Sequence, residues 1–339
     1  MAGKIVEGYA ALAAGQRLVP FAYEAPSLSG HEIRIQVTHC GVCYSDIHAI
    51  EDLYGATAYP FVPGHEIVGS ITETGQDVRE FQVGDRVGVG WQGRSCGTCE
   101  WCRRGEDQLC QNVVGNGVWM PYGGFASSTV ADSRFAYPLP DGMPAEDACV
   151  LLCAGITVYH ALNQHRTSDV QRIGIIGIGG LGHLAIQFAH TMGYHITVFS
   201  SSDSKKREAL AFGADDFICT TEKDAFAHRG ETFDLLFCTA HGSIRWNRLL
   251  DCIKKRGKLI LMGFPDVALN PTDLVVHELT IQGSFIGNRV QMREMLAFAQ
   301  QHQIRPVIET MPMSKVNEAI ERIRDNKARY RIVLVNDRF

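Results

Sequence analysis

The stretch that decides the fold is residues 172–182, "RIGIIGIGGLG". An apolar run leads directly into a G-x-G-x-x-G pattern formed by Gly177, Gly179 and Gly182, and residues 182–193, "GHLAIQFAHTMG", continue with helical periodicity. A strand, a glycine-rich turn and a helix in this order are typical of a dinucleotide site, where the backbone approaches the pyrophosphate at the helix N-terminus. The alternative is a glycine-rich bend without a ligand. The predicted loop also includes Gly180 and Leu181.

The two parts of the chain around this motif differ in pattern. From about residue 154, apolar runs alternate with helical segments, which predicts a parallel sheet. The expected strands are 172–178, 195–200, 233–239, 257–263 and 279–285, and a helix is expected at 204–214. Earlier residues indicate short strands broken by turns, as at 32–37 and 84–91, which favours a β-barrel. The end of the chain adds a helix at 314–326 and a strand at 331–335. A chain of 339 residues exceeds one ordinary core, so two domains are expected.

Composition excludes several classes of protein. The chain has 32 basic and 37 acidic residues and a net charge of -5, without a basic patch for nucleic acid or an anionic membrane. No apolar run approaches the roughly 18 residues of a membrane span, and the first ten residues lack a signal-peptide core. We therefore expect a cytoplasmic protein that acts on small molecules. In a reducing compartment, eleven cysteines favour metal binding or catalysis over disulfides.

Four cysteines lie close together in residues 95–110, "SCGTCEWCRRGEDQLC". Their spacing is C-x2-C-x2-C-x7-C, which lets one loop present four thiolates to a single ion. Zinc accepts such a closed tetrahedral shell, so the site should stabilise the loop without catalysing a reaction. An iron–sulfur cluster could use the same ligands, but nothing else in the sequence indicates electron transfer. The ligands would be Cys96, Cys99, Cys102 and Cys110.

A second metal site is predicted from residues that lie far apart in the sequence. Cys43 and His65 each lie beside a glycine, and Cys153 in "LLCAG" could reach them. Two cysteines, one histidine and a water form an open, catalytic zinc site. The alternative for Cys153 is a small core residue. The remaining cysteines are expected in the core: Cys40, Cys149, Cys219, Cys238 and Cys252.

The residues after the second expected strand indicate which dinucleotide binds. NAD sites have a carboxylate here, whereas this chain reads "VFSSSDSKKR", with Ser200, Ser201 and Ser202 followed by Lys205. Hydroxyls and cations suit the 2′-phosphate of NADP. A carboxylate about 5 Å from that phosphate would cost about 3 kcal/mol at an effective dielectric constant of about 20. Asp203 would reach the ribose if the register shifted by three residues, and the lysines could instead form a solvated helix face.

Together these motifs resemble a known family, the zinc-dependent medium-chain alcohol dehydrogenases. The resemblance extends over essentially the whole chain and is strongest to the NADP(H)-dependent group like cinnamyl alcohol dehydrogenase, in particular to the bacterial broad-range aldehyde reductases. It is carried by "GVCYSDIH", "PGHEIVG", the four-cysteine loop, "LLCAGITVY", "GIGGLGH", "VFSSSDSKK" and "ARYRIVL".

The resemblance implies a role for each matched residue. Cys43, His65 and Cys153 would bind the catalytic zinc, and Glu66 would approach the metal during ligand exchange. Asp46 would orient the histidine ligand, and Ser45 and His48 would relay a proton through the cofactor ribose. The implied cofactor contacts are Thr157, Ser200, Ser201, Lys205, Ser284, Ile286 and the pyrophosphate-binding Arg331.

Some of these residues have simpler alternatives. Asp46 could simply be a helix cap without any role at the metal. Arg331 could be a solvated strand residue, and His48 could be an ordinary surface histidine. The chain also departs from the family at Tyr44, where a histidine or arginine commonly reaches the phosphates, which puts that contact in doubt.

The family also implies an architecture and a reaction. Residues 1–153 and 288–339 would form a GroES-like catalytic domain, and residues 154–287 a Rossmann domain, with the active site in the cleft and a homodimer or homotetramer as the assembly. Two zinc ions per chain and NADP(H) would serve the interconversion of aldehydes and primary alcohols, most simply as an NADPH-dependent broad-range aldehyde reductase. The alternatives are a cinnamyl or aromatic alcohol dehydrogenase, a zinc-free quinone reductase and a non-enzymatic NADPH-binding protein. Candidate pocket walls are Tyr54, Trp91, Trp119 and Ile286.

Overall fold

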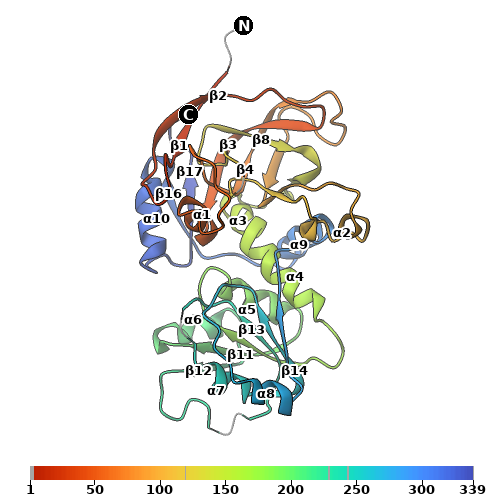
Figure 1. Cartoon of the computed structure of the whole chain (residues 1–339), viewed down its shortest axis with the longest axis vertical. Helices are drawn as coiled ribbons and strands as arrows, with labels where there is room; N and C mark the ends of the chain where they lie inside the picture. The colour runs from red at the N-terminus through yellow and green to blue at the C-terminus, as the bar shows by residue number, and fades with distance from the viewer. Residues whose placement is uncertain (1–3, 119, 228–229, 243, 339) are drawn as a thin grey trace. The chain divides into compact units, whose positions relative to one another are not determined.

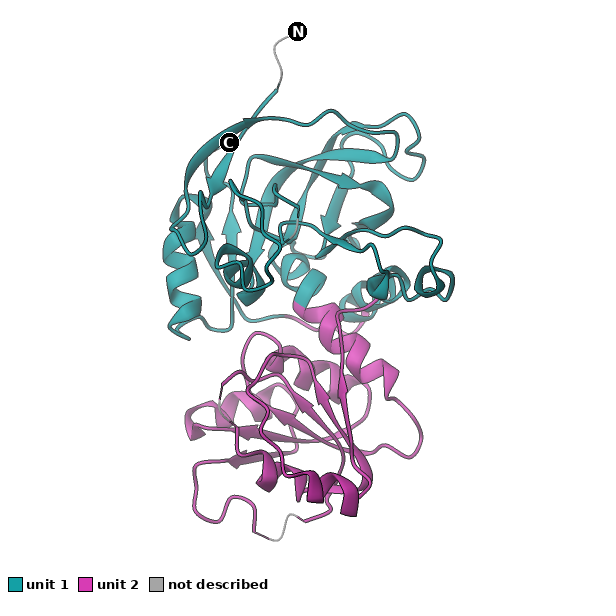
Figure 2. Ribbon diagram, in the orientation of Figure 1, with its two compact units in different colours: residues 1–153, 288–300, 306–339 teal, residues 154–287, 301–305 magenta. Residues whose placement is uncertain are grey.

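The computed structural model describes residues 4–118, 120–227, 230–242 and 244–338, so the pocket-wall candidate Trp119 lies outside the described residues. The chain divides into two compact units, coloured separately in Figure 2. Unit 1 consists of Met1–Cys153, Asn288–Gln300 and Pro306–Phe339, and unit 2 of Ala154–Gly287 and Gln301–Arg305. The short segment Gln301–Arg305 belongs to unit 2, where the backbone N–H and C=O of Arg305 both bond to the side chain of Gln187.

Unit 2 is built on the parallel sheet that the sequence predicts. Its strand order is β12-β11-β10-β13-β14-β15, and all five pairings are parallel (Figure 1). This order, 3-2-1-4-5-6 in chain sequence, is the Rossmann arrangement. The strands are β10 (Arg172–Ile176), β11 (His195–Ser200), β12 (Asp216–Cys219), β13 (Phe233–Cys238), β14 (Ile253–Leu261) and β15 (Thr280–Gly283).

The two central strands of this sheet are almost wholly apolar. Ile173 and Ile175 of β10 and Phe237 of β13 are fully buried, as expected for parallel strands covered on both faces. The predicted helix at 182–193 is present as α5, whereas the segment 204–214 is divided between the short 3-10 turn η4 and α6. The helical elements of unit 2 are α4 (Ile156–Gln164), α5 (Gly182–Thr191), η4 (Asp203–Lys205), α6 (Lys206–Ala211), α7 (Trp246–Leu250) and α8 (Pro271–Val276).

Unit 1 contains the short antiparallel strands that the sequence predicts. Its main sheet has the order β16-β17-β3-β4-β5-β9, with β8 also paired to β3, and only β16 and β17 run parallel to each other. Two small antiparallel pairs, β1-β2 and β6-β7, lie outside this path. The strands are β1 (Ile5–Ala10), β2 (Val19–Glu24), β3 (Glu32–Val42), β4 (Glu66–Thr74), β5 (Arg86–Val89), β6 (Gln92–Arg94), β7 (Val114–Gly115), β8 (Ser128–Asp132), β9 (Ala136–Pro138), β16 (Ile308–Pro312) and β17 (Arg331–Val335).

Three neighbouring strands of this sheet bring distant residues together. In the antiparallel registers, Gly41 of β3 lies opposite Glu66 of β4, and Val42 of β3 lies opposite Ile332 of β17. The end of β3, the start of β4 and the start of β17 therefore lie side by side at one end of these three strands. The helical elements of unit 1 are α1 (Tyr44–Ile50), α2 (Glu100–Arg103), η1 (Asp107–Leu109), η2 (Ser133–Phe135), α3 (Ala145–Val150), α9 (Arg289–Gln301), η5 (Met313–Lys315) and α10 (Val316–Arg324).

The helical stretch Ala145–Gln164 contains α3, α4 and a turn of π-helix, η3 (Leu151–Gly155), that carries Cys153. Within the described part of the chain, this stretch has the length and hydropathy of a membrane-spanning helix, and 72% of its most apolar window is buried. The core helix of a water-soluble domain has the same properties. Helix α3 packs on β3 and β4, so Cys153 lies where the other candidate ligands meet.

Candidate metal centres and nucleotide site

Four side chains of unit 1 form a compact donor cluster: Cys43, His65, Glu66 and Cys153, whose ligand atoms all lie within 4.8 Å of one another. The two sulfurs are 3.9 Å apart, and His65 Nε2 lies 3.3 Å from the Cys153 sulfur. A tetrahedral zinc with ordinary Zn–S and Zn–N bonds needs donor separations of about 3.5–3.8 Å. The residues therefore fit a zinc ion with little movement.

Asp46 holds two of these candidate ligands in place. Its Oδ1 lies 2.7 Å from His65 Nδ1 and accepts a bond from the Gly64 N–H at 3.1 Å, while Oδ2 accepts the Cys43 N–H at 2.8 Å. Because Nδ1 faces this carboxylate, Nε2 of His65 is left to face the metal position. Burial opposes protonation of His65, but the charge and hydrogen bond of Asp46 raise its pKa well above the usual value. Asp46 thus both caps α1 and orients the ring.

The two thiols of the cluster influence each other. Their mutual hydrogen bond lowers the pKa of Cys43 and raises that of Cys153, so a first thiolate forms readily and a second does not. Two thiolates in a buried site need a cation to compensate their charge. This is the donor chemistry that zinc requires.

Glu66 already has a partner in the cluster. It is fully buried and forms an ion pair with Arg331, which is 6% exposed. Oε1 of Glu66 is 4.0 Å from His65 Nε2. Burial raises the pKa of Glu66, and the charge of Arg331 opposes that effect. The predicted pyrophosphate contact Arg331 is therefore a buried β17 residue bound to Glu66, and not a solvated strand residue.

The predicted relay residues Ser45 and His48 lie three positions apart on α1 and so share one helix face. The Tyr54 hydroxyl is 3.3 Å from His48 Nδ1, and a hydrogen bond from the Ser45 side chain lowers the Tyr54 pKa against the larger, raising effect of burial. Tyr44, the position that departs from the family, packs its ring edge-on against His48 at 5.0 Å. The sequence named Tyr54 only as an apolar pocket wall, and no local pattern indicates its polar contacts.

The second cysteine group is also preformed. The sulfurs of Cys96, Cys99, Cys102 and Cys110 lie within 4.8 Å of one another, with Cys102 at 3.9 Å from Cys96 and 3.5 Å from Cys99. Backbone N–H groups donate to two of these sulfurs, from Cys99 to Cys96 and from Asn112 to Cys110, both at 3.3 Å. Such bonds lower the pKa of Cys96 to about 5, whereas burial raises the pKa of Cys110 to about 11. Four sulfurs close a zinc shell and leave no open position.

The glycine loop of unit 2 has the backbone geometry of a phosphate-binding turn. Gly177 has a φ of +95°, in the region that favours glycine. A Cβ on Gly182 would lie 2.1 Å from the Gly177 carbonyl oxygen, so only glycine permits the close approach of α5 to the turn. A Cβ on Gly179 would meet no atom within 4 Å. The loop, which also includes Gly180 and the α5 N-cap Leu181, is therefore open at Gly179, where a pyrophosphate would lie.

The predicted 2′-phosphate residues gather at the end of β11. The strand ends at Ser200, whose hydroxyl bonds to the Ser202 backbone, and Ser201 is exposed beside it. Lys205 reaches back to the glycine loop, where its Nζ donates to the Ile178 carbonyl at 2.8 Å. Asp203 begins η4, three residues after the strand end. The Lys205 ammonium therefore lies beside the glycine loop 177–182, although Lys205 is more than 20 residues further along the chain.

A further cation that the sequence analysis did not single out, Arg245, lies near the end of β11. The Arg245 guanidinium donates to the Thr220 carbonyl at 2.6 Å, and the Thr220 backbone N–H bonds to the Ser200 carbonyl at 2.7 Å. Arg245 precedes α7, 45 positions after Ser200, so only the strand order brings it near. The other predicted cofactor contacts in unit 2 are Thr157 on α4, Ser284 just after β15, and the buried Ile286.

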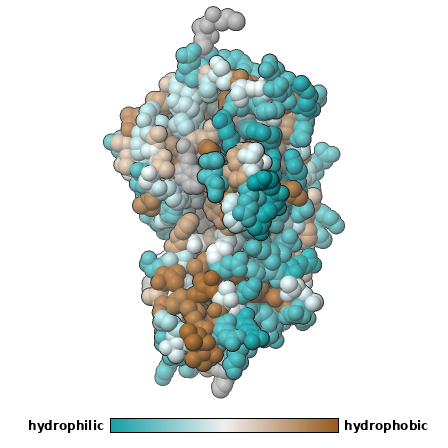
Figure 3. Space-filling view, turned by 45° about the vertical axis from the view of Figure 1, so that its right-hand side comes forward, coloured by the Kyte–Doolittle hydropathy of each residue, from teal (hydrophilic) through white to brown (hydrophobic). Residues whose placement is uncertain are grey.

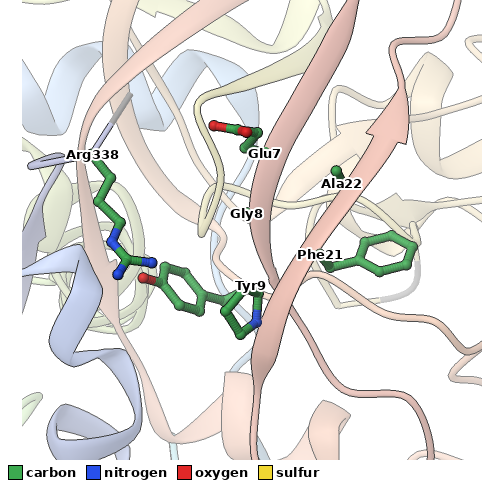
Figure 4. Close-up of a pocket in the computed structure, with 7 residues that line it drawn as sticks. Glu7, Gly8, Tyr9, Phe21, Ala22 and Arg338 are labelled. Atoms are coloured by element: carbon green, nitrogen blue, oxygen red, sulfur yellow. The ribbon is translucent and has the colours of Figure 1, made fainter.

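A separate cavity of about 410 Å³ lies between the β1-β2 pair and Arg338, near the end of the chain (Figure 4). The Arg338 guanidinium lies 6.0 Å from the centre of the Tyr9 ring, and Phe21 points away from this pair. None of the predicted site residues lines this cavity.

Comparison with known proteins explains the combination of sites. Residues 29–141 match the family model of the alcohol dehydrogenase GroES-like domain, and residues 180–301 match that of the zinc-binding dehydrogenases. A probable cinnamyl alcohol dehydrogenase 6 of Oryza sativa subsp. japonica is 37% identical over 97% of this chain and 95% of its own length. The chain belongs to the zinc-dependent medium-chain alcohol dehydrogenases. The predicted family and its group, like cinnamyl alcohol dehydrogenase, are confirmed, and so is the combination of a GroES-like and a Rossmann domain.

Other relatives of this dehydrogenase include both an aldehyde reductase and cinnamyl alcohol dehydrogenases. The aldehyde reductase AdhA of Synechocystis is 36% identical, over 97% of this chain and 98% of its own length. Among solved structures, a cinnamyl alcohol dehydrogenase of Sorghum bicolor has a TM-score of 0.92 at 34% identity, with 98% of both chains covered. A cinnamyl alcohol dehydrogenase of Helicobacter pylori, solved with NADP(H), has a TM-score of 0.89 at 28% identity, again with 98% coverage of both.

Proposed function

We propose that this dehydrogenase interconverts aldehydes and primary alcohols with NADP(H), and that it works mainly as a broad-range aldehyde reductase. The observation that carries the proposal is the cluster of Cys43, His65 and Cys153, two thiols and an imidazole at zinc-ligand separations. Zinc bound there would act as a Lewis acid on the carbonyl group, and nicotinamide would supply the hydride. A second zinc would be held by Cys96, Cys99, Cys102 and Cys110.

The protein's own residues prepare this centre. Asp46 fixes the tautomer and direction of His65, and the α1 turn fixes Cys43 through the same carboxylate. Glu66 lies close enough to compete for the metal, but the ion pair with Arg331 gives it another partner. We propose that this pair keeps the fourth position free for a substrate oxygen, and that Glu66 approaches the metal only during ligand exchange.

NADP(H) selectivity is proposed to depend on the end of β11. Ser200, Ser201 and Ser202 offer hydroxyls, and Lys205 offers a charge next to the glycine loop. No carboxylate stands at the strand end itself, because Asp203 lies three residues further on. Thr157, Ser284, Ile286 and Arg331 remain proposed cofactor contacts on family grounds.

The candidate functions also differ in the substrate that they imply. Relatives include enzymes named for cinnamyl alcohol, mannitol and aldehydes, so an aromatic alcohol dehydrogenase is the main alternative. A zinc-free quinone reductase would need all three candidate ligands to be idle, and a non-enzymatic NADPH-binding protein would have no use for the open site. The assembled cluster disfavours both.

We also propose a cytoplasmic homodimer or homotetramer. Unit 2 exposes large apolar side chains beside the edge strand β15, among them Phe264, Val275 and Val276, which are 65–75% exposed. Figure 3 shows hydrophobic residues gathered on one face of the lower half of the view. A contiguous apolar patch beside a strand edge suits a two-fold interface between copies. Light scattering of the purified chain tests the assembly.

The decisive experiment combines metal analysis with a substrate panel. The wild-type protein should contain two zinc ions per chain and reduce aliphatic and aromatic aldehydes with NADPH faster than with NADH. Cys43→Ser should retain one zinc, keep the fold and lose turnover. Cys219→Ser is the matched control, since the Cys219 thiol lies in unit 2, away from both cysteine clusters, and hydrogen-bonds to the Thr221 hydroxyl. One zinc with turnover in the wild type would favour the quinone reductase, and no turnover on any carbonyl would overturn the proposal.

A further inference from the structure

The α1 helix and the turn after it hold three hydroxyl and imidazole groups in a row. Ser45 and His48 lie on one face of α1, and the turn at Asp52 folds the chain back so that Tyr54 lies beside both. The Leu53 N–H bonds to the His48 carbonyl at 2.9 Å, and Asp52 Oδ1 accepts the N–H groups of Ala56 and Thr57, each at 2.9 Å. The position of Tyr54 is therefore fixed by backbone contacts.

We infer that the Tyr54 hydroxyl is an additional link in the proton relay, joining Ser45 to His48 within unit 1. The family pattern assigns the relay to Ser45, the cofactor ribose and His48, but here a protein hydroxyl already bridges the two side chains. The Tyr54 hydroxyl lies 3.3 Å from His48 Nδ1, and the Ser45 hydroxyl is close enough to lower the Tyr54 pKa by a side-chain hydrogen bond. This inference rests on the proposed function.

The proton count of this relay is balanced. During aldehyde reduction the Ser45 O–H donates its proton to the product oxygen, and Ser45 recovers one from the Tyr54 O–H. Tyr54 recovers one from His48 Nδ1–H while solvent delivers a proton to Nε2 of the same, partly exposed ring. His48 therefore stays neutral, and exchange with solvent returns its proton from Nε2 to Nδ1 before the next turnover. Alcohol oxidation runs the same transfers in reverse. Each aldehyde reduced takes up one proton from solvent through this relay, and no further reactant is needed.

The surroundings of His48 support this role. The imidazole is held edge-on between two aromatic rings, Tyr44 at 5.0 Å and Tyr54 at 5.8 Å between ring centres. Such contacts restrict the ring to orientations that keep Nδ1 toward the Tyr54 hydroxyl. Burial raises the pKa of Tyr54, so the phenol retains its proton and remains able to donate. Tyr44 thus has a positioning role here in place of the phosphate contact that the family pattern has at that residue.

The test is Tyr54→Phe, which removes one oxygen and keeps the ring against His48. The single-turnover rate of aldehyde reduction should fall about 100-fold, the lower end of the range for a positioned proton donor. A small tertiary-amine buffer, a poor zinc ligand, should restore part of the rate as its concentration rises. Zinc content and melting temperature should match those of the wild type. The control is Tyr59→Phe, because the Tyr59 hydroxyl donates to the Ile50 carbonyl at 2.9 Å and contacts Thr57, outside the relay.

A double-mutant cycle tests whether the two groups act in one chain. Tyr54→Phe combined with His48→Ala should be no slower than the slower single variant, because either change interrupts the same relay. Rate losses that multiply, or a Tyr54→Phe rate equal to that of Tyr59→Phe, would overturn the inference while the proposed function stands. A wild-type protein that reduces no aldehyde would overturn the proposed function instead.

Discussion

Asp46 Oδ1 lies 2.7 Å from Nδ1 of His65, and both residues are buried almost completely. The same carboxylate accepts N–H groups from Cys43 and Gly64, so one side chain orients an imidazole and fixes the loops on both sides of it. This relationship ties the shape of the α1 turn to the metal centre.

Asp46→Asn should weaken zinc binding at the three-ligand site. The amide removes the negative charge and turns an N–H toward a backbone N–H, so we expect an affinity loss of about 10- to 100-fold, as for other partners of ligand histidines. Competition with a chromogenic chelator measures it. Glu51→Gln is the control, because it removes the same charge at the end of α1, where Glu51 pairs with Arg324 and is not one of the candidate metal ligands. An unchanged zinc affinity in Asp46→Asn would contradict this assignment.

Arg331→Met should destabilise unit 1 strongly. It leaves Glu66 buried without its partner, which costs about 3–5 kcal/mol for a broken buried ion pair. Adding Glu66→Gln removes the uncompensated charge, so the double variant should recover part of that loss. Chemical denaturation of the wild type and of these two variants measures the effect. Equal stabilities of the single and double variants would show that the pair has no energetic coupling.

Lys205→Ala should change the choice of cofactor. The Lys205 ammonium donates to the Ile178 carbonyl, and we propose that it also binds the 2′-phosphate; loss of a charged hydrogen bond of about 1.5–3 kcal/mol should then raise the KM for NADPH about 10- to 100-fold. The KM for NADH should change little. Lys206→Ala, the exposed neighbour at the start of α6, is the control. If the KM values for both cofactors rise equally, Lys205 acts on the loop and not on the phosphate.

Cys102→Ser should reduce stability without direct effect on the chemistry. Cys102 lies near both Cys96 and Cys99, so its loss opens the shell that closes the loop 95–110. We expect one zinc fewer per chain, a lower melting temperature and faster proteolysis within that loop, with turnover retained by the folded fraction. Limited proteolysis with zinc analysis measures this. A variant that keeps two zinc ions per chain would exclude the four-cysteine shell.

Asp234 should make the stability of unit 2 depend on acidity. Its carboxylate accepts the backbone N–H groups of Gln171 and Arg172 and pairs with Lys254 at 2.6 Å, joining the starts of three strands. Burial opposes ionisation, but the Lys254 hydrogen bond and the two N–H bonds lower the pKa of Asp234 overall. The stabilisation is therefore complete above the unfolded pKa of about 3.9 and is lost as the pH falls through the folded value.

The variant Asp234→Asn makes this testable. It should cost about 2 kcal/mol near pH 7, the worth of hydrogen bonds to a charged group, and the difference from wild type should shrink below about pH 4. Asp224→Asn, on an exposed turn, should show no such difference at any pH. A constant Asp234→Asn deficit down to pH 3 would contradict the depressed pKa.

The sequence by itself determined the parts of this protein that depend on local spacing. Three glycines after an apolar strand predicted the nucleotide loop, because the turn needs a positive φ at Gly177 and no side chain at Gly182. Four closely spaced cysteines predicted one shell, since a short loop has few other ways to arrange them. Cys43, His65 and Cys153 were predicted because their residue types are rare together and each lies in a recognisable motif.

Only the tertiary structure decided what those residues contact. The pairing of Glu66 with Arg331 depends on the register of β17 against β3 and of β3 against β4, which joins positions 265 residues apart. Tyr54 acquired a polar role from the fold of one turn, and Arg245 reached the end of β11 through the strand order. Strand order and register arise from the burial of whole faces, so no short stretch of sequence contains them.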